Sequence, residues 1–372
     1  MRITIEKSAL MTSLGHVQSV VERRNTIPIL SNVQIEAEDG AVRLTATDLD
    51  IAIVERVDAD IQADGATTAP ALTLFDIVRK LPDGAQIELA LDQDQGRLKL
   101  HAGRSDFALS CLPREDFPVM ADDEMPHRFQ VSGPELRRMI DKSRFAISTE
   151  ETRYYLNGIY LHAFSGEAGP LLRAVATDGH RLARVEMPCP NGAEAMPGVI
   201  VPRKAVLELR KLIDGTSGEV EIGVSETRIR FVFDHVVLTS KLIDGTFPDY
   251  ERVIPSDNDK DLDVDPKVLS QAVDRVSTIS PEKSRAVKLS LDKDRIILSA
   301  NSPEQGSATE ELSADYAAEA MEIGFNARYL LDITDRIDGD KIRFRVSDPT
   351  SPTIVRDGAD DGALYVLMPM RV

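Results

Sequence analysis

The sequence is poor in cysteine and contains no long apolar segment. Its only cysteines among 372 residues are Cys111 and Cys189, which form no Cys-x-x-Cys pair and have no clustered histidines beside them. A disulfide framework is therefore excluded, and neither a zinc site nor another cofactor is indicated. No stretch of about 20 apolar residues is present, so no membrane span is predicted. The chain begins with a strand-like pattern rather than a signal peptide, which indicates a cytoplasmic protein.

The charge of the chain is strongly acidic, with a formal net value of −18 at pH 7. Taken alone, this value argues against a nucleic-acid-binding protein, because phosphate contacts require a basic surface. Hydrophobic residues make up 42% of the chain and charged residues 28%, the balance of a soluble globular protein. Whether the acidic total excludes nucleic acid therefore depends on where the basic residues lie.

One plan recurs three times along the chain. A predicted helix ends at an Asp-Gly turn and continues into alternating apolar and polar residues, in the segments 68–91, 199–224 and 323–346. These helices begin 132 and 124 residues apart, near Pro70, Pro202 and Asn326. Such separations are far longer than the roughly 20–50 residues of a solenoid repeat. We therefore predict three domains of one fold, with limits at 1–121, 128–255 and 259–372.

Each repeat is predicted to hold two helices and two sets of strands, which defines an α+β domain. Pro134 and Pro266 suit the first turn of a helix, where a missing N–H group costs nothing. The predicted helices are 8–21, 70–81, 134–146, 202–213, 266–278 and 325–337. The clearest predicted strands are 29–38, 42–48, 154–164, 172–187, 286–292 and 295–301.

Basic residues are concentrated in the predicted helices. The helices carry net charges of +3, +5 and 0 in the first, second and third domains, while the rest of the chain carries −26. One interpretation is that these residues form ordinary solvated helix faces. The other is that all the helices face a polyanion and that the strands and loops form an acidic exterior. Three domains are too few to surround a duplex, whereas two copies of the chain would suffice.

Seven strings, taken together and in order, resemble the bacterial sliding-clamp family, the beta subunit of DNA polymerase III. They are TIPILSN (26–32), RYYLNG (153–158), VATDGHRLA (175–183), VPRK (201–204), TSKLIDGTFPDY (239–250), IGFN (323–326) and YVLMPMRV (365–372). The resemblance covers essentially the whole chain. It implies three clamp domains, with helices lining the inside and antiparallel sheets outside, in a head-to-tail homodimeric ring around double-stranded DNA.

The resemblance also implies a non-catalytic processivity factor. The expected partners are a second copy of the chain, a clamp loader, the DNA polymerase III alpha subunit, and other polymerases or repair proteins that carry a clamp-binding peptide. A ring needs only phosphate contacts, which carry no sequence information. The positions that match DNA-facing residues of the family are Arg24, Tyr154, Tyr155, Lys204 and Arg252. The alternative for Tyr154 and Tyr155 is the packed start of a strand.

The family's partner groove lies between the second and third domains. Matching positions are Leu156, Thr177, Gly179, His180, Arg181, Leu182, Pro248, Val253, Asn326, Tyr329, Val366, Met368, Pro369, Met370 and Arg371. Methionine side chains are flexible and polarisable, so one groove can accept different apolar anchors. We expect Leu156, Leu182, Val253 and Val366 to form an apolar floor, and Arg181, Asn326 and Arg371 to fix a peptide. Without the family, Met368 and Met370 would be assigned to the core of a last strand.

Two other functions compete with the clamp. A hydrolase would use Asp178 to orient His180 as a general base, although no nucleophile or metal motif accompanies them. Asp48 in the string ATDLD repeats Asp178 in ATDGH without the histidine, which favours a scaffold role for the aspartate. The other alternative is a scaffold that binds only proteins, and the basic helices argue against it.

The resemblance places the dimer contact between the first domain of one copy and the third domain of the other. Phe107 and Leu109 alternate along one predicted strand and would pack against Ile279 of the other copy, with Arg104 facing Glu304. The alternative is that Phe107 and Leu109 point into their own core. Pro352 occupies a position where the family commonly has a small hydroxyl residue, and it is expected to stiffen one rim of the groove.

Overall fold

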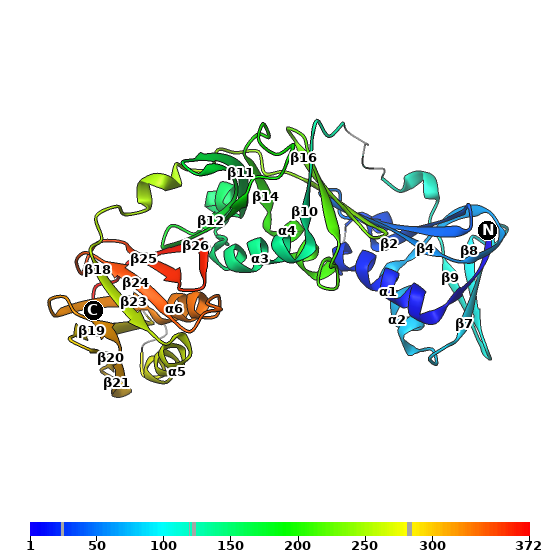
Figure 1. Ribbon diagram of the computed structural model, residues 1–372. Helices are drawn as coiled ribbons and strands as arrows, with labels where there is room; N and C mark the ends of the chain where they lie inside the picture. The colour runs from blue at the N-terminus through cyan, green and yellow to red at the C-terminus, as the bar shows by residue number, and fades with distance from the viewer. Residues whose placement is uncertain (24–25, 119, 121–123, 281–284) are drawn as a thin grey trace. The chain divides into compact units, whose positions relative to one another are not determined.

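The computed structural model describes residues 1–23, 26–118, 120, 124–280 and 285–372 (Figure 1). The chain forms two compact units, of which the first contains residues 1–137, 191–196 and 204–242, and the second contains residues 138–190, 197–203 and 243–372. The predicted middle domain contributes residues to both units, so the three domain limits stay a prediction. Arg24, one of the predicted DNA-facing residues, lies outside the described residues.

Two antiparallel sheets form the first unit. The five-stranded sheet has the order β5 (Asp60–Ala63), β1 (Arg2–Glu6), β7 (Gln86–Asp92), β8 (Arg97–Ala102) and β9 (Ser105–Ser110). The eight-stranded sheet has the order β10 (His127–Ser132), β15 (Glu219–Val224), β16 (Arg228–Phe233), β17 (Val236–Lys241), β4 (Ile51–Asp58), β3 (Ala41–Thr47), β2 (Asn32–Glu38) and β6 (Gly65–Pro70). The β17–β4 pair therefore joins strands that are distant in the sequence.

Two helices pack beside these sheets, α1 (Lys7–Val17) and α2 (Ala71–Lys80). Glu6 caps α1 by accepting the backbone N–H groups of Ser8 and Ala9 at 2.8 and 3.3 Å. On the buried side of α1, the Ser13 hydroxyl donates to the Glu55 carboxylate of β4 at 2.8 Å. The face of the eight-stranded sheet that carries Glu55 is thus the face covered by α1.

The second unit also contains two antiparallel sheets. The nine-stranded sheet has the order β14 (Val199–Pro202), β11 (Gly158–Gly166), β12 (Gly169–Thr177), β13 (Arg181–Pro188), β26 (Asp360–Leu367), β25 (Thr353–Asp357), β24 (Ile342–Val346), β18 (Lys260–Val264) and β22 (Asp315–Tyr316). The four-stranded sheet has the order β21 (Gly306–Ser313), β20 (Arg295–Ser302), β19 (Ala286–Asp292) and β23 (Met321–Asn326). The β13–β26 pair joins the second and third predicted domains.

Helices α5 (Pro266–Ser277) and α6 (Ala327–Thr334) pack against each other in the second unit. Asp265 caps α5, and Pro266 occupies its first turn as predicted. The two remaining helices are α3 (Gly133–Ser143) and α4 (Arg203–Leu212), and each has residues in both units. The six predicted helices are confirmed, with ends that differ by up to four residues. No helix within the described residues is long and apolar enough to cross a membrane.

Three predicted strands were wrong in extent. Residues Glu151–Leu156 form a 3₁₀ turn, and the strand predicted from 154 begins only at Gly158. An ion pair links Arg153 of this turn to Glu150, the residue just before it, with a nitrogen–oxygen distance of 2.6 Å. The strand predicted over 172–187 is two strands, β12 and β13, because the Asp178 side chain closes a turn between them. Similarly, Pro28–Ser31 form a 3₁₀ turn before β2.

Candidate partner groove and nucleic-acid interface

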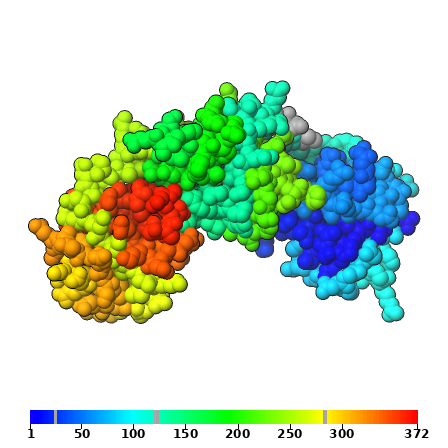
Figure 2. All heavy atoms as spheres, viewed as in Figure 1, coloured from blue at the N-terminus to red at the C-terminus, as the bar shows by residue number. Residues whose placement is uncertain are grey.

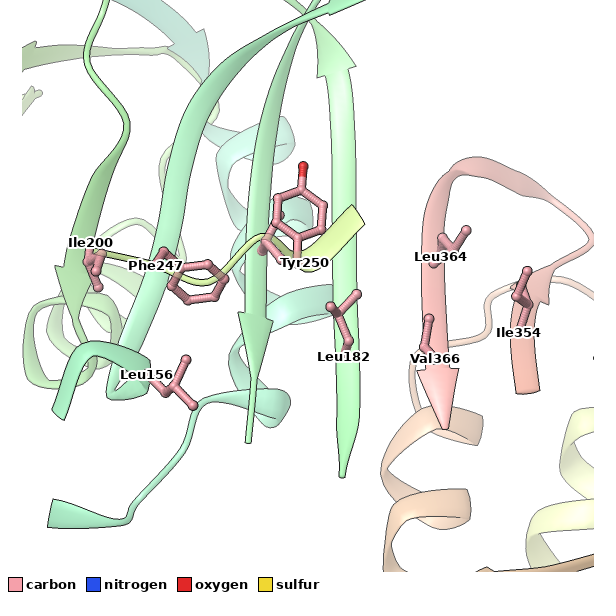
Figure 3. Close-up of a cluster of buried hydrophobic side chains, with 9 residues drawn as sticks. Leu156, Leu182, Ile200, Phe247, Tyr250, Ile354, Leu364 and Val366 are labelled. Atoms are coloured by element: carbon pink, nitrogen blue, oxygen red, sulfur yellow. The ribbon is translucent and has the colours of Figure 1, made fainter. Parts of the chain in front are cut away.

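A buried apolar cluster lies on one face of the nine-stranded sheet (Figure 3). Its members are Leu156, Val175, Leu182, Ile200, Phe247, Tyr250, Ile354, Leu364 and Val366. Phe247 stacks on Tyr160 with ring centroids 4.8 Å apart and an angle of 7° between the rings. Three predicted floor residues, Leu156, Leu182 and Val366, are therefore brought together, but they are only 4%, 2% and 2% exposed.

The fourth predicted floor residue differs from the other three. Val253 is 49% exposed, so it lies at the surface rather than in the floor. Met368 is also exposed, at 38%, as are Pro248 and Arg371. The region thus combines a packed apolar base with several accessible side chains.

The C-terminal segment is fixed to the second unit through its backbone. The Met368 N–H donates to the His180 carbonyl at 2.9 Å, and the Met370 N–H donates to the Gly324 carbonyl at 2.8 Å. A Cβ atom at Gly324 would lie 2.6 Å from the Met370 carbonyl oxygen, so glycine permits this close approach. Figure 2 shows the C-terminal residues, in red, at the surface of this unit. The backbone is therefore held while the Met368 side chain stays accessible.

The Arg181 side chain is buried in the single chain and links three parts of the second unit by hydrogen bonds. Its guanidinium group donates to the carboxylates of Asp178 and Asp332 at 3.1 and 2.5 Å, and to the Phe145 carbonyl at 2.7 Å. It also lies 4.3 Å from the centroid of the Tyr329 ring. Arg181 is therefore held within its own unit by three acceptors, and its expected role in fixing a peptide stays a prediction.

Asn326 likewise has a local role. Its side-chain oxygen accepts the Arg328 N–H at 2.9 Å and caps α6. This oxygen serves the helix rather than a peptide, and Pro369 and Met370 lie partly buried nearby in the C-terminal segment.

Asp178 shapes a turn rather than a catalytic pair. Its Oδ1 accepts the backbone N–H groups of His180 and Arg181 at 2.9 and 3.0 Å. The Thr177 hydroxyl accepts the Gly179 N–H at 3.1 Å and donates to the Arg181 carbonyl at 2.8 Å. The His180 ring stacks on Tyr329, with centroids 6.4 Å apart. This geometry does not support the hydrolase alternative.

The same turn occurs in the first unit, which confirms the scaffold role predicted for the repeated aspartate. Asp48 Oδ1 accepts the N–H groups of Asp50 and Ile51 at 2.9 and 2.7 Å. The Thr47 hydroxyl accepts the Leu49 N–H at 3.0 Å, as Thr177 does for Gly179. The two ATD strings therefore encode one backbone conformation.

The predicted DNA-facing residues have different environments. Tyr154 is 54% exposed and packs edge-on to the partly buried Tyr155, at 5.8 Å between ring centroids. Both lie in the 3₁₀ turn, so the packed start of a strand does not describe them. Arg252 is exposed and pairs with Asp249 at 2.7 Å. Lys204, in the other unit, is paired with Glu22 at 3.3 Å and with Asp48.

The charge on Lys204 is stabilised by these two carboxylates. Partial burial lowers its pKa, but the hydrogen bonds and charges of Asp48 and Glu22 outweigh this effect and raise the pKa above the ordinary lysine value. Lys204 is therefore cationic at neutral pH, and its contacts with the two acids would compete with a phosphate.

The predicted dimer residues lie on sheet edges and loops. Phe107 is 37% exposed on β9, the edge strand of the five-stranded sheet. Leu109 is only 8% exposed, so for this residue the alternative of packing in its own core describes the single chain. Arg104 and Glu304 are exposed, and Ile279 is partly buried at the end of α5.

The cluster contains residues that the sequence patterns did not predict. Phe247, Tyr250, Ile354 and Leu364 pack with the predicted floor residues. Leu364 lies two positions before Val366 on β26, so strict alternation would have found it. Phe247 belongs to the Phe-Pro string shared by residues 117–118 and 247–248, which is a second usable signal.

Three sequence profiles of one family cover nearly the whole chain. The N-terminal, central and C-terminal domains of the DNA polymerase III beta subunit match residues 1–121, 130–249 and 251–371. The chain belongs to the DNA polymerase III beta subunit family. The beta sliding clamp of Caulobacter vibrioides is 55% identical over 372 residues, which are 100% of both chains.

Solved structures of this family have the same fold. The crystal structure of the Caulobacter crescentus beta sliding clamp has a TM-score of 0.98 at 55% identity, over 100% of this chain and 99% of that one. The sliding clamp of Bartonella birtlesii, crystallised with griselimycin bound, has a TM-score of 0.97 at 52% identity, over 100% of both chains. The family resemblance is therefore confirmed, and the chain is a non-catalytic DNA sliding clamp.

Proposed function

We propose that two copies of the chain form a head-to-tail ring around duplex DNA. We also propose that the ring tethers partner proteins through a groove over the buried apolar cluster that contains Leu182 and Val366. The observation that carries the groove is the exposed Met368 side chain, whose backbone is tied to the His180 carbonyl. A fixed backbone with a flexible apolar side chain gives a surface that adapts to different anchors at low entropic cost. Val253 and Pro248 extend this apolar surface.

Two free sheet edges support the head-to-tail ring. Within the described residues, β9 pairs only with β8, and β21 pairs only with β20. An exposed edge strand presents unpaired backbone groups to another strand. We propose that β9 of one copy lies beside β21 of the other, with Phe107 as the apolar contact.

Contact with DNA is proposed to use Arg24, Tyr154, Tyr155, Lys204 and Arg252. Such contacts reach only the backbone of the duplex and permit sliding. A clamp loader would open the ring, and the DNA polymerase III alpha subunit, other polymerases and repair proteins would bind the groove by a short peptide. These roles imply that the protein acts in the cytoplasm, with the chromosome.

The deciding experiment is topological. The protein is loaded by its clamp loader on nicked circular DNA, and the circle is then linearised. A ring slides off the linear form and stays on the circular form. Retention on linear DNA at moderate salt, or failure to remain on the circle, would contradict the encircling ring and leave a protein-only scaffold.

The groove and the dimer contact have separate tests. Deleting Met368–Val372 should abolish stimulation of the polymerase while leaving the dimer intact. Ile279→Asp should weaken the dimer, because it would bury an unpaired charge at the contact. Sedimentation that shows an unchanged Ile279→Asp dimer would remove Ile279 from the interface.

A further inference from the structure

The rings of His180 and Tyr329 and the guanidinium group of Arg181 lie together in the second unit. The two rings stack with their centroids 6.4 Å apart and an angle of 24° between them. The guanidinium carbon of Arg181 lies 4.3 Å from the centroid of the Tyr329 ring. His180 is exposed and Tyr329 is half-buried, so the Tyr329 ring contacts the Arg181 cation while part of it stays at the surface.

The three acceptors of the Arg181 guanidinium group come from three different elements. Asp178 belongs to the turn between β12 and β13, and Phe145 belongs to a short 3₁₀ turn directly after α3. Asp332 lies on α6, and its Oδ2 accepts a hydrogen bond from Nη1 of Arg181 at 2.5 Å. Of the three acceptors, Asp332 is the one that shares a helix with Tyr329.

Asp332 and Tyr329 are three residues apart on α6, so their side chains lie on the same face of the helix. The Arg181 cation therefore meets this face twice, through the Asp332 carboxylate and through the Tyr329 ring. A hydrogen bond between two charged groups is stronger and more directional than a cation–π contact at a partly exposed ring. The bond to Asp332 thus sets the position of the cation over α6, and the cation in turn sets the orientation of the ring.

The other contacts of Arg181 separate this positioning effect from folding. The Asp178 carboxylate at 3.1 Å and the Phe145 carbonyl at 2.7 Å would still bind the guanidinium group if the charge of Asp332 were removed. The Asp332 side chain is 29% exposed, so water could still reach a neutral amide at this position. Arg328 lies 4.0 Å from the same Asp332 oxygen, but its side chain is 67% exposed and the pair is screened by solvent.

We propose that Asp332 is a positioning residue of the partner groove. Through Arg181 it fixes the Tyr329 ring, with His180 stacked on it, as a preformed aromatic wall for an apolar side chain of a partner peptide. A wall that is already ordered costs less conformational entropy when the peptide binds. Asp332 itself does not contact the peptide. The proposal rests on the groove of the proposed function.

The test compares two matched substitutions. Asp332→Asn keeps the size of the side chain and removes its charge, and Asp335→Asn makes the same change at the exposed residue that follows α6. The probe is the DNA polymerase III alpha subunit of the same organism, and surface plasmon resonance measures its dissociation constant. We expect about fivefold weaker binding for Asp332→Asn, because the Tyr329 ring then occupies the competent orientation for only a fraction of the time. Asp335→Asn should leave binding unchanged.

Two further measurements distinguish a positioning role from a general loss of stability. In a chain that carries Tyr329→Ala, Asp332→Asn should change the dissociation constant by less than about twofold, because the side chain that it positions is gone. In ¹³C-tyrosine NMR, the Tyr329 ring signal should move with Asp332→Asn and not with Asp335→Asn. Tyr329→Phe identifies that signal among the seven tyrosines of the chain. Circular dichroism checks that each variant is folded.

Several outcomes would overturn the proposal. These are unchanged binding with Asp332→Asn, equal losses with Asp332→Asn and Asp335→Asn, a fivefold loss that persists in the Tyr329→Ala chain, and a Tyr329 signal that does not move. Failure of the proposed groove looks different, because the native chain itself would then not bind the alpha subunit, or binding would survive deletion of Met368–Val372. Either of these results would reject the groove and the positioning role together.

Discussion

The turns at residues 47–51 and 177–181 share one backbone and differ in what their aspartates hold. The second oxygen of Asp48 accepts Lys204, which comes from a distant helix, whereas the second oxygen of Asp178 accepts Arg181 of its own turn. The Lys204 side chain is 38% exposed, and the Arg181 side chain is 9% exposed. The same turn therefore binds a partly exposed lysine from a distant helix in the first unit, and a buried arginine of the turn itself in the second unit.

The largest expected effect concerns the sheet position that follows each turn. Leu182→Asp places a carboxylate in the apolar cluster and should lower the unfolding free energy by about 3 kcal/mol or more. Ala52→Asp, at the equivalent position on β4, lines a pocket of about 390 Å³ on the eight-stranded sheet and should cost about 1 kcal/mol. Urea unfolding of the two variants measures the difference. Equal losses would show that the two sheet faces are not distinct environments.

The second effect compares the two basic residues. Arg181→Ala leaves two carboxylates and a carbonyl without their donor and should cost about 3 kcal/mol. Lys204→Ala removes a partly exposed ion pair and should cost at most about 1 kcal/mol. The midpoint of thermal unfolding reports both changes. A larger fall in the unfolding midpoint for Lys204→Ala than for Arg181→Ala would contradict the view that Arg181 stabilises the fold more than Lys204 does.

The third effect concerns the left-handed residue of each turn. Leu49 and Gly179 have φ angles of +79° and +88°. Gly179→Ala should destabilise by roughly 1–2 kcal/mol, because a Cβ atom is unfavourable in this conformation. Leu49→Gly relieves the same strain in the exposed first turn and should change stability by less than about 1 kcal/mol. Urea unfolding of the two variants should therefore show a clear loss only for Gly179→Ala.

The smallest effect is a difference in pH dependence between the two units. The hydrogen bond of His16 Nδ1 with the Glu55 carboxylate, at 2.7 Å, raises the pKa of His16 despite partial burial. The stabilisation of the fold by protonated His16 is therefore complete below about pH 6.5, the ordinary histidine pKa. It is lost as the pH rises through the higher pKa of His16 in the folded chain. Burial lowers the pKa of His162, so this residue destabilises the fold as the pH falls below about 6.5.

Two substitutions separate these contributions. Between pH 8 and pH 5.5, the native chain should gain stability relative to His16→Gln and lose stability relative to His162→Gln. Thermal unfolding midpoints at several pH values give both differences. The same sign for the two variants would contradict the opposite pKa directions of the two histidines.

Local patterns in the sequence predicted the local parts of this structure well. The helices followed from apolar spacing and from residues such as Pro266, and the turn role of Asp178 followed from the repeated ATD string. The role of Arg181 did not follow, because its partner Asp332 lies 151 residues away and no local pattern joins them. Tyr154 and Tyr155 favoured a strand by residue type, but a nearby ion pair and a turn outweighed that preference.

The family resemblance predicted more than the residue patterns did. It assigned Leu156, Leu182 and Val366 to one floor, although Val366 is distant from the other two in the sequence. It could not show that these three side chains share one buried cluster with Phe247 and Tyr250. Burial of this kind depends on the loop at 247–250, whose place over the sheet is set by tertiary packing.

The pairing of β4 with β17 has a consequence for synthesis of the chain. Among the described strand pairs, Ile51 pairs only with Ser240, so the eight-stranded sheet cannot form completely until the ribosome has synthesised β17. Until then, β4 is an open edge on the nascent chain, able to pair with other strands. Folding of the first unit is therefore expected to wait for most of the second predicted domain, and fragments that end near residue 121 should aggregate more readily than fragments that end after Lys241.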